Sequence, residues 1–255
     1  MKSAGAGVWG VAVLLALSGP ASGKDPPTLT LTQGARVGIV NLLDAEVTHF
    51  HSSATIQDSF LKTHAVDWPV DSLFAEAVRQ RLMQMGLEAV PIAPSAALER
   101  GRQEFFVEGS VTKGLSKACA AEFTQMAAAE HVDAFIVLAP GVNDSAHAGG
   151  ARRKDLPDYL RGWGFVTRAG DPPGTKPAVF NMTQVLLVGA TGGTALLRAR
   201  EWGGDYTYSW QSFSPPSSLK DIPQSEIDTL RPVFADIVTR QSGRLFEQIT
   251  VAGRQ

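Results

Sequence analysis

A pair of histidines two positions apart is the first feature of this sequence that could carry chemistry. His49 and His51 lie in the segment DAEVTHFH, which also contains Asp44 and Glu46. Alternate residues of an extended strand project from the same side, so both imidazoles could bind one metal ion, with a carboxylate completing the ligand set. The other interpretations are a polar strand edge and a pH-sensitive patch, since imidazole titrates near neutrality. A metal-binding protein that uses His49 and His51 is therefore kept as an alternative.

A second polar segment follows another apolar run and could share a site with the first. Residues 36–43 (RVGIVNLL) and 134–138 (AFIVL) have the pattern of strands buried on both faces. Ligands of parallel sheets bind beyond the carboxyl ends of the strands. If these two strands are neighbours, the polar residues that follow them meet at one edge and form a ligand-binding site. The candidates are Asp44, Glu46, His49, His51, Asn143, Asp144 and His147.

Two short motifs resemble those of the GDSL/SGNH esterase family. Residues 70–73 (VDSL) are similar to the Asp-Ser-Leu nucleophile block of that family, at the start of a predicted helix. Residues 141–144 (GVND) match its Gly-x-Asn-Asp oxyanion block, directly after a predicted buried strand. The resemblance implies that Ser72 attacks an ester and that Asn143 donates a hydrogen bond to the oxyanion. It implies a secreted ester hydrolase.

The general base of such a hydrolase has no counterpart near the C-terminus. The family carries an Asp-x-x-His there, whereas the last of the five histidines in this chain is His147. The pair Asp144 and His147 has that spacing but overlaps the oxyanion block, and the leading Gly of the nucleophile block is Val70 here. A serine hydroxyl without a base is a poor nucleophile at neutral pH. We therefore prefer a binding function and keep a hydrolase using Ser72 as the alternative.

Two further motifs have structural explanations. Cys119 shares a helical face with Phe123 and Met126, so we expect a buried thiol. Residues 185–195 (VLLVGATGGTA) look like the glycine-rich turn of dinucleotide-binding enzymes, but no acidic residue follows at the distance that such sites require. A tight turn between two strands accounts for the same glycines. We expect no cofactor.

The order of the predicted elements indicates an α/β fold. Strands and helices alternate in the first half of the chain, which predicts a partly parallel sheet in a three-layer-like sandwich. The second half adds an antiparallel hairpin and a closing C-terminal helix. We predict strands at 36–43, 87–92, 104–112, 134–138, 178–188 and 194–202, and helices at 70–86, 95–102, 117–130 and from 225 to about 251.

Three segments have patterns that are less regular. Residues 46–56 alternate loosely and predict an edge strand or an extended loop, while the glycine-rich and charged residues 140–175 predict a long loop. Pro232 is expected to kink or restart the last helix. The element order broadly resembles the soluble cores of envelope-assembly proteins such as the curli-secretion lipoprotein and the TolB N-terminal domain. That resemblance implies a binding role.

The N-terminal residues have the pattern of a secretory signal peptide. Lys2 is followed by an apolar run at 8–17, which is shorter than the roughly 20 residues that span a bilayer. Pro20 and the small residues 21–23 follow as a cleavage region. We predict a signal peptide at 1–23, a flexible arm at 24–34 and a single α/β domain at 35–255. The expected location is periplasmic or secreted, with no integral membrane segment after cleavage.

The composition is that of an ordinary globular protein, with 44% hydrophobic and 19% charged residues. A net charge of −2 and a pI near 6.2 give no basic footprint for nucleic acid. The single cysteine excludes an intramolecular disulfide. The sequence therefore predicts an exported, non-catalytic binding or assembly module of the bacterial envelope, with a ligand or protein partner that its residues do not identify.

Overall fold

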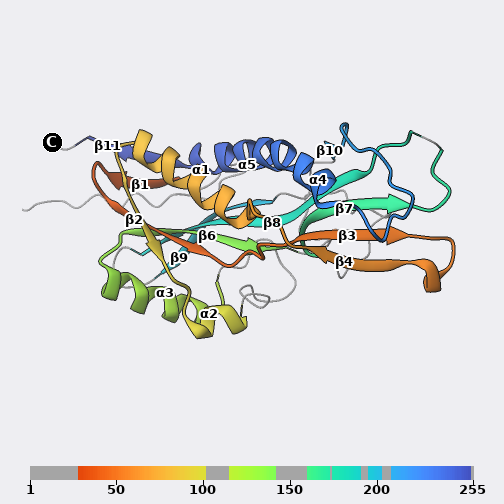
Figure 1. Cartoon of the computed structure of the whole chain (residues 1–255). Coiled ribbons are helices and arrows are strands. Elements are labelled where there is room, and N and C mark those ends of the chain that lie inside the picture. The colour runs from red at the N-terminus through yellow and green to blue at the C-terminus, as the bar shows by residue number, and fades with distance from the viewer. Residues whose placement is uncertain are drawn as a thin grey trace, which may run out of the picture.

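A mixed β-sheet runs through the length of the protein and carries helices on both faces (Figure 1). The computed structural model describes residues 28–101, 115–141, 160–172, 174–190, 195–202 and 208–253. Within these residues the main sheet has the order β4-β3-β7-β8-β6-β2-β5, with β9 and β10 also paired to β8. This architecture confirms the predicted α/β class. The predicted signal peptide and the strand expected at 104–112 lie outside the described residues.

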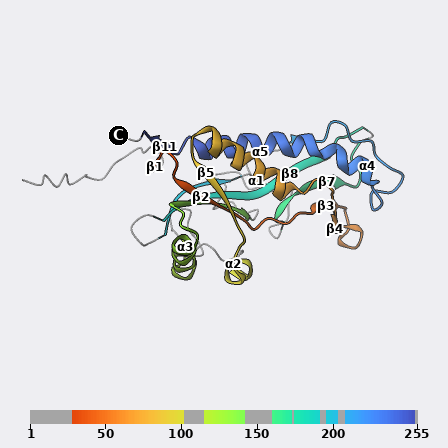
Figure 2. The ribbon, with the colours of Figure 1, turned by 60° about the vertical axis from the view of Figure 1, so that its left-hand side comes forward.

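The parallel part of the sheet is built from the apolar strands that the sequence predicted. Strand β2 (Arg36–Asn41) lies between β5 (Glu88–Ile92) and β6 (Ala134–Pro140) and is parallel to both. Helix α1 (Val70–Gln84) covers one face of the sheet. Helices α2 (Ala96–Gly101) and α3 (Lys117–Glu130) cover the other, as Figure 2 shows. The connection from β2 to β5 therefore has its helix on one face of the sheet, and the connection from β5 to β6 has its helices on the other. This change of face is the arrangement that opens a crevice at the carboxyl ends of strands.

The amphipathic pattern of α1 explains how it packs. Phe74, Val78 and Leu82 recur at helical spacing and are completely buried against the sheet and α5. The helix ends at Gln84, and Gly86, two residues later, has a positive φ of 76° that is unstrained without a Cβ. Asp71 lies in the first turn, after the N-cap Pro69, and its carboxylate accepts a hydrogen bond from Asn41 of β2.

Strand β8 (Ala178–Gly189) is long enough to join two parts of the sheet. Its first residues pair with β7 (Gly162–Arg168), and its last residues pair with β6. Strand β9 (Leu196–Trp202) returns antiparallel to β8 and confirms the predicted hairpin. A dinucleotide motif requires a helix after the glycine turn, so this antiparallel pairing is the finding that excludes it.

Two sequence predictions are wrong at the other end of the sheet. Strand β3 (Val47–Ser52) is interior, because β4 (Phe60–His64) pairs along one side and β7 along the other. The expected loop at 140–175 contains β7, whose residues from Gly162 to Thr167 are buried. The sequence of β7 has two glycines and no regular alternation. Its strand conformation depends on pairing with β3 and β8, which are distant in sequence.

The C-terminal region differs from the single helix that was predicted. Helix α4 (Gln224–Ile227) and a 3-10 turn (η3, Asp228–Leu230) precede α5 (Arg231–Phe246). Pro232 lies in the first turn of α5, where its missing amide costs nothing, so the predicted restart is confirmed. The chain then forms β11 (Ile249–Ala252), which pairs in parallel with β1 (Leu29–Thr32), inside the segment expected as an arm. The remaining short elements are η1 (Ile56–Asp58) and β10 (Tyr208–Ser209).

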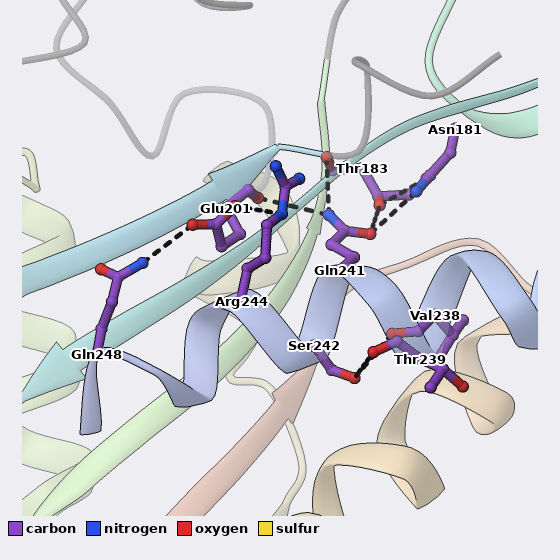
Figure 3. A network of polar contacts seen from close by, with 9 residues as sticks. All are labelled: Asn181, Thr183, Glu201, Val238, Thr239, Gln241, Ser242, Arg244 and Gln248. Carbon is purple, nitrogen blue, oxygen red and sulfur yellow. Dashed lines mark hydrogen bonds and ion pairs between the residues drawn. The ribbon is translucent and has the colours of Figure 1, made fainter. Parts of the chain in front are cut away.

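A buried polar network fixes α5 to the sheet (Figure 3). Gln241 projects from α5 to β8, where its side-chain oxygen accepts hydrogen bonds from Asn181 Nδ2 at 2.9 Å and Thr183 Oγ1 at 3.1 Å. These three side chains are completely buried. Arg244 lies one helical turn after Gln241 and forms an ion pair with Glu201 of β9 at 3.3 Å. Glu201 also accepts a hydrogen bond from Gln248 Nε2 at 2.9 Å. Buried polar groups need such partners, so the network fixes the register of the helix on the sheet.

We predict that Gly164→Ala separates β3 from β7. A Cβ at this position would collide with the backbone oxygen of Thr48 and approach Cζ of Phe180 to 2.7 Å. Because the oxygen is backbone, only a shift of the whole strand relieves the contact. The unfolding free energy should fall by about 3 kcal/mol, measured by urea denaturation. The matched control, Gly243→Ala in α5, meets no atom within 4 Å and should be neutral or stabilising. Equal effects of the two substitutions would contradict this prediction.

Candidate functional site

The carboxyl end of β2 lies beside that of β6, so the condition set for a shared polar edge is met. Asn41 of β2 is in register with Leu138 of β6, and the two strands are parallel. Asp44 and Glu46 are exposed in the turn that follows β2, where the backbone oxygen of Asp44 accepts a hydrogen bond from Trp163 Nε1 at 3.1 Å. The predicted Asn143, Asp144 and His147 lie outside the described residues. The proposed ligand-binding edge therefore stays a prediction on its β6 side.

A groove of about 570 Å³ opens at the carboxyl ends of β2 and β5, beside the first turns of α1. Its apolar floor comes from the two strands and from the residues after β5. Polar side chains come from the end of β2 and from α1. The lining residues are Ile39, Asn41, Ser72, Ala75, Glu76, Arg79, Pro91, Ile92 and Ala93. We call this the carboxyl-end groove, and its location is the one where open α/β sheets bind ligands.

Asn41 holds the walls of the carboxyl-end groove together. Its Nδ2 donates to Asp71 Oδ2 of α1 at 3.0 Å, and its Oδ1 accepts from the backbone amide of Leu43 at 3.2 Å. A second hollow of about 460 Å³ also includes Asn41 and lies toward α2. Asn41 is the polar residue that ends the first apolar strand, but neither Asn41 nor Asp71 is among the predicted site residues. An amide at the end of an apolar strand was the one signal that could have found them.

The rim of the groove carries an ion pair that is neutral overall. Arg79 Nε and Nη2 each donate to the Glu76 carboxylate at 2.8 Å, and Gln80 Nε2 donates to it at 2.7 Å. The hydrogen bonds from Arg79 lower the pKa of Glu76 to about 2, so the pair stays charged across the physiological range. A rim whose charges cancel gives no preference for anionic or cationic ligands at a distance.

Ser72 lies at the groove without the partners that a nucleophile needs. It is exposed in the first turn of α1, where its amide donates to the Pro69 oxygen at 3.1 Å. Among the described residues, no hydrogen bond joins its hydroxyl to an imidazole. His131, at the end of α3, has its backbone oxygen bonded to Arg36 at the opposite end of β2. The other described histidines are His49, His51 and His64, in β3 and β4.

These three histidines form a buried cluster away from the groove. His49 and His51 project from the same side of β3, as the spacing predicted. Both contact the Thr167 hydroxyl, His49 through Nε2 at 2.7 Å and His51 through Nδ1 at 2.8 Å. His64 of β4 stacks on His49 with ring centroids 5.9 Å apart. We call His49, His51, His64 and Thr167 the histidine cluster.

The geometry of the cluster offers hydrogen bonding more readily than metal coordination. The ring nitrogens of His49 and His51 that point toward each other are both hydrogen-bonded to the Thr167 hydroxyl. In the part of the chain that the structure describes, no group of three or more His, Cys, Asp or Glu side chains could hold a metal ion. Asp44, the nearby carboxylate that could complete the ligand set, is exposed in the turn before β3. The metal-site hypothesis therefore lacks a third ligand within the described residues.

All three imidazoles are biased toward their neutral forms. Burial, together with the positive charges of His64, His51 and Lys62, lowers the pKa of His49 to about 3. Burial also lowers the pKa of His51 and His64, with Lys220 and Lys62 respectively contributing. Neutral imidazoles can remain in this apolar environment at pH 7, whereas charged ones carry a desolvation cost.

Cys119 has the structural role that its sequence pattern predicted. The residue is buried in α3, and its amide donates to Ser116 Oγ, the N-cap of that helix, at 3.2 Å. Burial, with Glu122 nearby, raises the pKa of the thiol to about 12. Because the thiolate is the reactive species, this cysteine is a poor nucleophile.

The solved structures that this chain resembles include two of low similarity. No family model and no curated protein matches the chain. A dodecameric PelC variant from Paraburkholderia phytofirmans is 12% identical, with a TM-score of 0.29, over 83% of this chain and 91% of that one. The hypothetical protein CT253 from Chlamydia trachomatis is 12% identical, with a TM-score of 0.34, over 82% and 96%. At these values the likenesses carry no argument about function. Among the described helices, none is long and apolar enough to cross a membrane.

We predict that His49 makes the protein acid-labile. Its pKa is lower in the folded than in the unfolded chain, where it lies near 6.5, so the unfolded chain binds the proton first. Stability is therefore full above pH 6.5 and falls, by up to about 1.4 kcal/mol per pH unit, as the pH drops toward 3. In His49→Leu, the slope of unfolding free energy against pH should decrease by about one proton. In the matched control, His131→Asn, an unchanged slope is expected, and an equal decrease there would contradict the assignment.

Proposed function

We propose that this chain is a non-catalytic binding protein of the bacterial envelope, and that the carboxyl-end groove receives its ligand or partner. The observation that carries this proposal is the groove itself, formed where a parallel sheet ends and braced by the hydrogen bond from Asn41 to Asp71. Walls that are fixed before binding reduce the entropy lost on association.

The composition of the groove supports a partner that contributes an apolar side chain. Ala75, Pro91 and Ala93 supply apolar surface, while Glu76 and Arg79 form a rim whose charges cancel. Binding sites of this kind gain most of their affinity from apolar contact and their orientation from a few polar groups. A protein or peptide segment with one apolar anchor fits this description better than a phosphate, because no cation in the lining is free of its carboxylate partner.

Export to the envelope is part of the proposal and depends on the N-terminal sequence. The positive start, the apolar run at 8–17 and the small residues at 21–23 have the order of a signal peptide. The fold has no intramolecular disulfide bond, since the chain has a single cysteine, which is buried. Fractionation of cells that express the full chain, with mass determination of the mature N-terminus, tests this part.

A photo-crosslinking experiment tests the groove. A benzophenone side chain is placed at Ser72, inside the groove, or at Met83, which is 57% exposed on the same helix outside it. We expect discrete adducts from position 72 in intact cells, weakened severalfold when Ala93→Trp fills the groove. Ala93→Trp should leave the melting temperature nearly unchanged. Adducts of equal yield and identity from both positions, or adducts that persist in Ala93→Trp, would count against this site.

The hydrolase alternative has its own test. The Ser72 hydroxyl has no imidazole partner in the described residues, so we expect no labelling by a fluorophosphonate probe at pH 7.5. A known serine esterase in the same reaction serves as the positive control. Labelling of the natural chain that disappears in Ser72→Ala would replace the binding proposal with ester hydrolysis.

A further inference from the structure

The binding proposal does not use two buried ring nitrogens of the histidine cluster. His49 Nδ1 and His64 Nε2 are inaccessible to solvent, and within the described part of the chain neither has a hydrogen-bond partner. His49 is completely buried and His64 is 8% exposed. A neutral imidazole needs only one donated proton, so an unpartnered nitrogen can remain as a lone pair. An imidazolium donates from both nitrogens, so protonation would bury a donor without an acceptor as well as a charge.

The charges around the cluster add to this cost. Lys62 of β4 opposes protonation of His49 and His64, and Lys220, from the segment 211–223, opposes that of His51. Asp58 of η1 favours the charged form of His51. The histidine rings also contact two phenylalanine rings. Phe165 stacks on His49 at 4.4 Å, and Phe60 lies 5.0 Å from both His49 and His51.

The cluster lies where the β3–β4 hairpin meets the segment 211–223. Lys62 Nζ donates to the backbone oxygen of Lys220 at 2.6 Å, and Lys220 Nζ lies 5.9 Å from the Phe60 ring. Immediately before this segment, Trp210 packs against Phe165 of β7 with ring centroids 4.9 Å apart. Strand β4 lies at one end of the sheet, and within the described residues it pairs with β3 (Figure 1). This hairpin can therefore separate from the segment without breaking the pairing of β2, β5 and β6.

We propose that the histidine cluster is an acid-sensitive latch, in which uptake of protons by His49 and His64 releases the segment 211–223 from the β3–β4 hairpin. At neutral pH the uncharged rings pack with Phe60 and Phe165, and the latch is closed. Below pH 6.5 the open form binds protons that the closed form excludes. The ratio of open to closed molecules then rises by up to tenfold per pH unit for each histidine that becomes exposed. Opening uncovers the aromatic rings on one end of the sheet.

Hydrogen exchange of the full chain tests the latch. Amide protection, corrected for the intrinsic rate at each pH, is measured by mass spectrometry at pH 7.5, 6.0 and 5.0. We expect protection of residues 60–64 and 211–222 to fall by at least tenfold between pH 6.0 and 5.0, while β2 and β6 keep theirs. In His49→Leu/His64→Leu, most of this pH dependence should disappear, and in His131→Asn it should persist.

A second measurement covers the case in which the double variant does not fold. Carbon-13 NMR of histidine Cε1 in the natural chain should show His49 and His64 neutral at pH 6.0, with changes at lower pH that accompany the loss of protection. Protection that is constant down to pH 5.0, protection lost from all strands together, or histidines that titrate near 6.5 would each overturn the latch. These outcomes are independent of crosslinking at Ser72, so failure of the latch and failure of the groove are distinguishable.

Discussion

The pairing of β8 along two different sets of strands is the constraint on which the rest of the structure depends. Its last residues complete the parallel part of the sheet beside β6, and its first residues carry β7 and, through it, the β3–β4 hairpin. The Gln241 network attaches α5 to the middle of this strand, at Asn181 and Thr183. The buried side-chain amide of Gln241 finds hydrogen-bond partners at this place on β8, which fixes the position of α5. Helix α5 in turn packs against α1, the helix that lines the groove.

Local patterns in the sequence were sufficient for the parallel half of the fold. Residues 36–43 and 134–138 are apolar at every core position, and α1 has a regular helical stripe, so burial and period agree. Strand β7 was not predictable because its two glycines are explained only by neighbours. Gly164 permits the close approach of Thr48 from β3, a contact between residues more than a hundred positions apart. Likewise, β11 follows α5 without a break in pattern and exists by pairing with β1.

The sequence predicted the location of the candidate site better than it predicted the residues that form it. The rule for parallel strands led to the carboxyl end of β2, where Asn41 and the groove lie. Spacing alone also placed His49 and His51 on one side of a strand. What the spacing could not give was their distance from that edge or their burial, since both depend on β3 being enclosed by β4 and β7. Their shared hydroxyl partner, Thr167, lies in the strand that was expected as a loop.

The length of β8 also affects how a partner protein can bind this chain. Strands β2 and β5, whose ends line the carboxyl-end groove, and the β3–β4 hairpin are separate parts of one extended sheet (Figure 1). A scaffold that touched both would engage the chain bivalently, and the second contact would form at the high effective concentration set by the first. Two individually weak attachments could then give lasting retention through avidity, and loss of either one would permit rapid exchange.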